Sequence, residues 1–159
     1  MGDLKMEKNN FVISSDDFLA FLIEAKQNTY AGHRERASSS REKSKDYIFE
    51  KGIFTYRDSY FGNRTDIGEE VVWVNSMPFW AMNYKGRMLP EFYNIEKETF
   101  SFLRNALKLC SKDSPFRGPL YYTEGDFEYF NSFEGDISWF SGYEIIKYKK
   151  NELHNRKYH

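Results

Sequence analysis

Cysteine is almost missing from this 159-residue chain, which contains only Cys110. No disulfide can form within the chain, and zinc sites that need several cysteines are excluded. Long apolar runs are missing as well: residues 1–10 lack the apolar segment of a signal peptide, and no stretch approaches the ~18 apolar residues of a membrane span. These absences predict a cytoplasmic protein that does not enter a membrane.

A charge excess of either sign is also missing. The chain has 23 Lys and Arg against 24 Asp and Glu, a formal net charge of -1 and a pI near 6.3. Proteins that bind duplex nucleic acid usually have a clustered basic surface and a high pI, so direct duplex binding is disfavoured. The length is typical of one domain with one core.

Aromatic side chains, in contrast, are abundant: 15 Phe, 12 Tyr and 3 Trp make up 19% of the chain. A core built from them is dominated by rings, which pack well in β-sheets. The same side chains also line pockets for flat ligands. Ordinary sheet core is the simpler of these two interpretations.

The spacing of apolar residues predicts an α-ββββ-α-ββββ order. A first helix is expected over 15–28, where apolar residues recur at helical spacing behind a serine cap, and a second one is capped by Asn94 and ends before residue 111. Residues 32–45 form a basic loop, interpreted either as a lid that grips anions or, more simply, as a solvated surface loop. The expected strands lie at about 46–51, 53–61, 69–75, 79–85, 120–123, 126–133, 143–150 and 152–158.

An internal repeat relates the two groups of strands. EKGIFTYRDSYFG (50–62) aligns with TEGDFEYFNSFEG (123–135) at an offset of 73, and the matches continue at an offset of 74. The matched pairs include Gly52–Gly125, Tyr56–Tyr129, Asp58–Asn131, Tyr60–Phe133, Gly62–Gly135, Gly68–Gly142, Glu70–Glu144 and Tyr84–Tyr158.

The repeat sets the expected fold class and domain division. We expect an α+β fold of two αβ4 pseudo-repeats with mainly antiparallel sheet, related by a pseudo-two-fold axis. Residues 1–13 are expected to be a flexible N-terminus, and residues 14–159 a single α+β domain whose halves are 14–89 and 90–159.

Two carboxylates are candidates for a site. Alternate residues of a strand share a face, so Asp58 is expected to point the same way as the aromatic rings of its strand, with Glu70 beside it on the next strand. A buried carboxylate needs a partner. Two interpretations stay open: Asp58 accepts from turn amides while Glu70 pairs with Arg57 or Arg64, or the two carboxylates line a pocket in which a ligand completes the set.

Further candidates lie in VVWVNSMPFWAMNYKG, where Trp73, Trp80, Asn83 and Tyr84 offer stacking surfaces and an amide. Such residues suit a heteroaromatic ring and equally suit a sheet core. We expect any site in the first half, because the second half has His154 where the first has Trp80.

Catalytic signatures are mostly missing. No phosphate-binding glycine loop, GxSxG or HExxH motif is present, and Cys110 falls on an apolar helix stripe, where a thiol is normally inert. Asp58 with Glu70 or Glu69 can serve as an acid/base pair in a hydrolase, but any acidic sheet supplies such pairs. We therefore predict no catalytic residue, no metal site and no cofactor.

Several stretches resemble the DUF5680 family of bacteria and archaea: TYAG (29–32), SKDY (44–47), YRDSYFGNRTDIGEEVVW (56–73), PFWAMNYKG (78–86), RGPLYY (117–122), EGDFEYFN (124–131) and WFSGYE (139–144). The resemblance covers about residues 16–159. Members occur alone or after a helix-turn-helix DNA-binding domain, which implies a sensory or ligand-binding role. Only about 13 residues precede the first helix here, so a regulatory role is expected to need a partner chain.

The function favoured by these observations is non-enzymatic binding of a small, planar, anionic, nucleotide-like molecule. The alternatives are a protein-interaction module that forms a dimer or hetero-complex, and a carboxylate-dependent hydrolase. The expected ligand-binding residues are Tyr56, Arg57, Asp58, Tyr60, Arg64, Glu70, Trp73, Trp80, Asn83 and Arg117, with further charge from Arg34.

Overall fold

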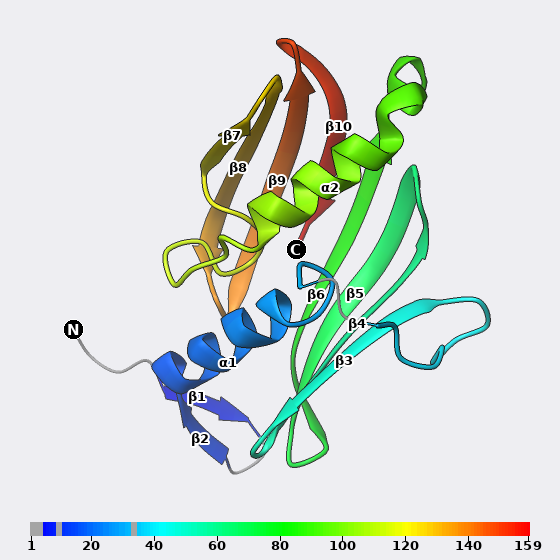
Figure 1. Cartoon of the computed structure of the whole chain (residues 1–159). Coiled ribbons are helices and arrows are strands. Elements are labelled where there is room, and N and C mark those ends of the chain that lie inside the picture. The colour runs from blue at the N-terminus through cyan, green and yellow to red at the C-terminus, as the bar shows by residue number, and fades with distance from the viewer. Residues whose placement is uncertain (1–4, 9–10, 33–34) are drawn as a thin grey trace.

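The computed structural model describes residues 5–8, 11–32 and 35–159, which form a long antiparallel sheet with two helices on one of its faces (Figure 1). In chain order the elements are β1 (Lys5–Lys8), β2 (Phe11–Ser14), α1 (Ser15–Gln27), β3 (Lys45–Lys51), β4 (Phe54–Gly62), β5 (Thr65–Val74), β6 (Met77–Met88), η1 (Pro90–Ile95), α2 (Glu96–Leu107), β7 (Tyr121–Glu124), β8 (Phe127–Asp136), β9 (Trp139–Tyr148) and β10 (Asn151–Tyr158). The predicted α-ββββ-α-ββββ order is confirmed.

A short hairpin precedes that order. β1 and β2 pair antiparallel, from Lys5 opposite Ser14 to Lys8 opposite Phe11. The hairpin lies largely within the segment 1–13, which was predicted to be a flexible N-terminus. The remaining residues of that prediction lie outside the described part of the chain.

The two helices begin in different ways. The Ser14 side chain accepts a hydrogen bond from the Asp17 amide at 3.1 Å, which is the predicted cap of α1. The predicted Asn94 cap of α2 is wrong. Pro90 fixes its own φ and begins the 3₁₀ turn η1, which includes Asn94 and leads directly into α2 without a side-chain cap.

The large sheet confirms the α+β class and its mainly antiparallel character. Its strand order is β3-β4-β5-β6-β10-β9-β8-β7, and every neighbouring pair is antiparallel. β3 to β6 form one up-and-down meander and β7 to β10 form another, so the last strands of the two groups meet at the centre. There Tyr84 of β6 lies directly opposite Tyr158 of β10.

Corresponding turns of the two meanders share their backbone conformation. Gly62 is the last residue of β4 and Gly135 the last but one of β8, and their φ values are 84° and 91°. A Cβ at either position would lie 2.0 Å from a backbone oxygen, so only glycine fits. A two-residue turn at Asn75–Ser76 joins β5 to β6, with positive φ at both residues.

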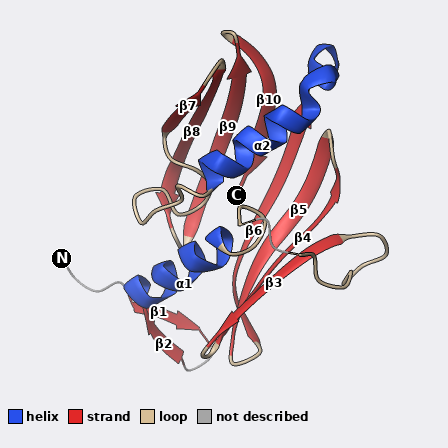
Figure 2. Ribbon diagram, viewed as in Figure 1, coloured by secondary structure: helices blue, strands red, loops and turns tan. Residues whose placement is uncertain are grey.

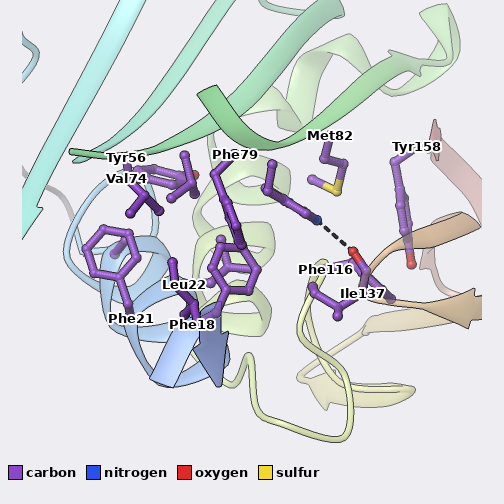
Figure 3. Close-up of a cluster of buried hydrophobic side chains, with 14 of the residues drawn as sticks. Phe18, Phe21, Leu22, Tyr56, Val74, Phe79, Met82, Phe116, Ile137 and Tyr158 are labelled. Atoms are coloured by element: carbon purple, nitrogen blue, oxygen red, sulfur yellow. Dashed lines mark hydrogen bonds between the residues drawn. The ribbon is translucent and has the colours of Figure 1, made fainter. Parts of the chain in front are cut away.

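Both helices cover the same face of the sheet (Figure 2). Figure 3 shows the α1 side, where Phe18, Phe21 and Leu22 point toward rings and aliphatic groups of β4 to β6. On the α2 side, Phe102 and Leu103 pack with residues of β8 to β10. The aromatic core predicted from composition is therefore present in two adjoining clusters.

None of the described helices lies over the opposite face of the sheet (Figure 1). Burial along β6 alternates residue by residue, so each strand places one set of side chains in the core and the other set toward solvent. None of the described helices is long and apolar enough to cross a membrane.

Candidate functional site

A pocket of about 460 Å³ opens on the helix-covered face, beside the first half of α2. Four rings line it, together with five cationic side chains, three carboxylates and one amide. The rings are Tyr30, Tyr60, Tyr84 and Phe100; the cations are Arg36, Lys97, Arg104, Arg117 and Arg156; the other groups are Asp58, Asp66, Glu96 and Asn63.

The pocket is assembled from parts of the chain that are far apart in sequence. Its floor comes from β4, β5, β6 and β10, and one wall comes from Lys97, Phe100 and Arg104 of α2. These three residues share a side of α2, because residues three and four apart are neighbours on a helix. The basic loop between α1 and β3 closes another side with Arg36.

Asp58 is the most unusual group in the pocket. Its side chain is buried, with only 5% of the residue exposed, and its Oδ1 accepts a hydrogen bond of 2.7 Å from the Tyr84 hydroxyl. Among the described residues, no donor reaches its other oxygen, Oδ2. Burial and the nearby Glu70 carboxylate raise the pKa of Asp58 to about 7.

Gly68 permits this contact, because a Cβ there would lie 2.6 Å from the Tyr84 ring and hydroxyl. The prediction that Asp58 accepts from amides of the following turn is wrong, since its partner is a cross-strand tyrosine. A buried carboxyl that titrates near neutral pH in a pocket is a recognised property of functional sites.

A buried ionic network lies under the pocket. Lys26 pairs with Glu70, and Arg117 reaches Glu70 at 3.8 Å while donating two hydrogen bonds of 3.0 Å to Glu144. Glu70 therefore does not pair with the arginines proposed from sequence. Instead it joins α1 to the segment that follows α2.

The same network continues to β10. Arg156 contacts Glu144 and Asp66 at 2.6 Å each. Burial raises the pKa of Glu144, but Arg117 and Arg156 outweigh this effect and hold that pKa well below its usual range. The charges of both arginines are thus largely compensated inside the protein.

The other three cations of the pocket are different. Among the described residues, no carboxylate lies within ion-pair distance of Arg36, Lys97 or Arg104. Arg104 lies over the Tyr30 ring at 4.7 Å, and a hydrogen bond with Tyr47 raises the pKa of Arg36. Glu96, the carboxylate of the same wall, is already paired with Arg64 at 2.7 Å. The opening of the pocket therefore carries uncompensated positive charge.

The residues predicted from sequence are distributed over several places. Asp58, Tyr60 and Arg117 line the pocket. Tyr56 and Glu70 lie just below, around a void of about 30 Å³ that Asp58 also lines. Strand alternation placed Tyr56, Asp58 and Tyr60 on one face, with Glu70 beside Asp58. Arg117, which follows α2, is brought to them by the fold.

Four predicted residues lie away from the pocket. Arg57 and Trp73 are on the uncovered face, around a separate hollow of about 400 Å³, and Arg57 pairs there with Asp46 at 2.9 Å. Asn83 is exposed on the same face. Arg64 lies outside the pocket over the Tyr93 ring, at 4.2 Å.

Trp80 belongs to the core. Its Nε1 donates to the Ile137 carbonyl at 3.0 Å, the dashed line in Figure 3, and its ring stacks on Phe140 at 5.8 Å. Asp58, Glu70 and Trp80 therefore do not converge on one cavity. Arg34, which was expected to supply charge, lies outside the described residues.

Sequence reasoning missed the contribution of α2 and β10. Lys97, Phe100 and Arg104 form a stripe on α2 beside its buried apolar stripe. Nothing in the local sequence shows that this second stripe faces the sheet. Arg156 and Asp66 meet across the β6–β10 pairing, which depends on the arrangement of the two halves.

The single thiol and possible metal ligands add no further site. Burial raises the pKa of Cys110 to about 11, and its Sγ contacts the Ser114 and Pro115 carbonyls. Within the described part of the chain, no three His, Cys, Asp or Glu side chains are grouped so that they can hold a metal ion.

Fold and pocket together define an α+β domain with a cationic, ring-lined pocket on the helix-covered face of its sheet. Comparison with known families gives a match over residues 58–159 to the family described as Domain of unknown function (DUF5680), and the chain belongs to this family. No curated protein and no solved structure matches the chain.

Proposed function

We propose that this protein binds a small, planar, anionic molecule in the pocket beside α2. The observation that carries the proposal is the combination of uncompensated cations at the opening with a buried, incompletely hydrogen-bonded carboxyl on the floor. Surface cations usually remain solvated without a special role. Here Arg36, Lys97 and Arg104 converge on one pocket, and Arg104 is half-buried.

The anionic character of the ligand follows from this charge. A phosphate or carboxylate can accept charge-assisted hydrogen bonds from the two guanidinium groups and the ammonium group. Electrostatic steering by the same groups favours the approach of an anion.

The planar character follows from the walls. Tyr60, Tyr84 and Phe100 contribute ring surfaces, and a pocket of this size is within the range that holds small organic ligands. The ligand-binding role predicted from composition is therefore kept, with α2 and the loop before β3 in place of Trp73, Trp80 and Asn83.

We also propose that the two halves arose by duplication and are related by a pseudo-two-fold axis. Supporting this are the identical strand order in each group and the matching φ values of Gly62 and Gly135. A two-fold axis between antiparallel strands places a residue opposite its own equivalent where the axis passes between the strands, as Tyr84 and Tyr158 are. An experimental structure in which residues 45–88 and 121–158 do not superpose would contradict it.

Thermal shift measurements across nucleotides and other anionic metabolites test the binding proposal. A ligand at 100 times its Kd adds about 2.7 kcal/mol to stability, which raises Tm by several degrees. Arg104→Gln is expected to reduce the shift at least threefold, whereas Lys147→Gln on the uncovered face leaves it unchanged. Uniformly null shifts with the unaltered protein contradict the proposal.

A second candidate, an acid–base enzyme, is favoured by one observation. A carboxyl whose pKa is near the working pH is well suited to exchange protons with a bound substrate, and the pKa of Asp58 is about 7. The Asp58→Asn variant separates catalysis from binding. If the protein is an acid–base enzyme, this variant loses turnover while it still binds the substrate. If a bound compound is recovered chemically unchanged after long incubation, the enzymatic alternative fails for that compound.

A further inference from the structure

One pair of corresponding residues makes different hydrogen bonds in the two halves. Asn131 of β8 aligns with Asp58 of β4, and both lie beside a cross-strand tyrosine: Tyr158 donates to Asn131 Oδ1, and Tyr84 donates to Asp58 Oδ1, each at 2.7 Å. The Asn131 amide then completes its hydrogen bonds within the protein, whereas Oδ2 of Asp58 has no donor among the described residues.

The segment between α2 and β7 supplies the partners of Asn131. Nδ2 of Asn131 donates to Gly118 O at 2.9 Å and to Ser114 Oγ at 3.2 Å. Between these two contacts, Phe116 inserts its ring into the core. Segment 114–118 therefore presents polar atoms and a flat ring side by side.

The Phe116 ring occupies a distinctive place. It stacks on Phe140 with ring centroids 3.9 Å apart, and it contacts Phe133 edge-on at 5.1 Å and Tyr158 at 6.2 Å. Phe133 and Tyr158 correspond to Tyr60 and Tyr84 in the first half.

Tyr60 meets the edge of the Tyr30 ring at 6.2 Å, but among the described residues no ring contacts Tyr84, and both tyrosines line the pocket. The second half thus fills, with its own chain, a position that corresponds to the pocket of the first half.

We propose that the ligand occupies this position in the first half: its ring lies against Tyr60 and Tyr84, an exocyclic amino group of the ring donates to Asp58 Oδ2, and its anionic group lies at Arg36, Lys97 and Arg104. This inference rests on the proposed function and names the ligand class. It is an amino-substituted heteroaromatic ring joined to a phosphate or carboxylate, such as an aminopyrimidine or aminopurine nucleoside monophosphate.

The direction of the hydrogen bond follows from the change of asparagine to aspartate. The amide of Asn131 donates to a carbonyl, but an ionised carboxylate can only accept. An exocyclic amino group satisfies Oδ2, whereas a ring carbonyl at the same place faces it oxygen to oxygen. A site built for one such edge rejects the wrong edge strongly, because a buried polar group is then left unpaired.

The protonation state of Asp58 makes the direction of this hydrogen bond measurable through the pH dependence of ligand affinity. The charged or titratable groups that face Asp58 come from α1, β3, β4, β5, β6 and the segment after α2; they are Lys26, Tyr47, Tyr56, Tyr60, Glu70, Tyr84 and Arg117. With the pKa of Asp58 at about 7, a donor edge binds the form that prevails above neutral pH. Affinity for it then falls roughly tenfold between pH 8 and pH 6, while affinity for an acceptor edge rises.

Isothermal titration at pH 8 and pH 6 with four probes tests the inference: cytidine, uridine, adenosine and inosine 5′-monophosphates. We expect cytidine and adenosine monophosphates to bind at least tenfold more tightly than their uridine and inosine counterparts at pH 8. We also expect their affinity to weaken toward pH 6. Asp58→Asn is expected to remove both the preference and the Asp58-linked part of the pH dependence, which separates it from titration of the probe phosphate.

The outcomes are distinguishable without relying on the variant. Equal affinities for the four probes, or tighter binding of the uridine and inosine monophosphates with affinity rising toward pH 6, overturn the inference and leave the proposed function standing. If none of the four binds the unaltered protein at millimolar concentration, the inference and the nucleotide-like form of the proposed function both fail.

Discussion

At the residue scale, Asp58 shows how one substitution separates a functional residue from a structural one. Its counterpart Asn131 is neutral and fully hydrogen-bonded, so the fold itself needs only an amide at this position. Aspartate in the first half places a carboxyl in a setting that disfavours its charge. Retaining such a group costs stability and suggests selection for another property.

The stability cost of Asp58 should depend on pH. Because its pKa rises from 3.8 to about 7 on folding, the folded protein holds this proton more tightly than the unfolded chain does. The carboxyl is therefore harmless near pH 4, and stability is lost as pH rises through about 7. Asp58→Asn is expected to increase the free energy of unfolding at pH 8 by about 4 kcal/mol, because a pKa difference of one corresponds to about 1.4 kcal/mol. At pH 4.5 it should change little.

Urea denaturation of both proteins at the two pH values checks this. Asn131→Asp places the same carboxyl in the second half, beside the Gly118 carbonyl, and should destabilise the protein most at pH 8. Equal effects of Asp58→Asn at both pH values would show that Asp58 does not titrate near neutrality.

At the element scale, close packing of a tyrosine on a glycine recurs in both strand groups. A Cβ at Gly142 would lie 2.1 Å from the Tyr158 ring, and one at Gly68 would lie 2.6 Å from the Tyr84 ring. Both tyrosines use this space to reach Asn131 or Asp58. The glycines therefore determine where the hydroxyl groups donate.

Gly142→Ala is expected to displace Tyr158 and to destabilise the protein by about 2–3 kcal/mol, as over-packed core positions do. Gly125→Ala is the matched control. It meets no atom within 4 Å and carries only the strain of its φ of 59°, which costs roughly 1 kcal/mol. Chemical denaturation of the two variants tests this prediction. Equal losses of unfolding free energy in Gly142→Ala and Gly125→Ala would contradict the steric argument.

The helices and strands were largely predictable from sequence, whereas the pocket was only partly so. Strand alternation placed Asp58 and Tyr60 on the correct face, because a period of two is fixed by the backbone. The same rule puts Trp73 on the opposite face from Glu70, because the two residues are three positions apart on one strand, so the two could not line one pocket. Trp80 looked suitable for a ligand because a core tryptophan and a binding tryptophan are chemically identical.

At the scale of the whole molecule, the ionic network joins parts of both halves into one unit. Asp66 belongs to the first half, Glu144 to the second, and Arg156 contacts both. Removing one partner of a buried ion pair leaves the others uncompensated. The two halves should therefore unfold together.

Arg156→Met is expected to reduce the free energy of unfolding by about 3–5 kcal/mol while unfolding remains a single transition. Hydrogen exchange in β4 and in β8 should accelerate to the same extent. Lys112→Gln, which removes an exposed pair with Asp16, serves as the control and should change little. Faster exchange in β8 alone would show that the halves are independent.

The position of β10 has a consequence for synthesis on the ribosome. Although β10 follows all the other strands in the chain, it lies in the middle of the sheet, between β6 and β9. While the chain emerges, the first meander has a long unpaired edge at β6, and unpaired edges of this kind attract other strands. The nascent protein is therefore most prone to aggregation after β6 has emerged, until β10 is inserted and that edge is protected.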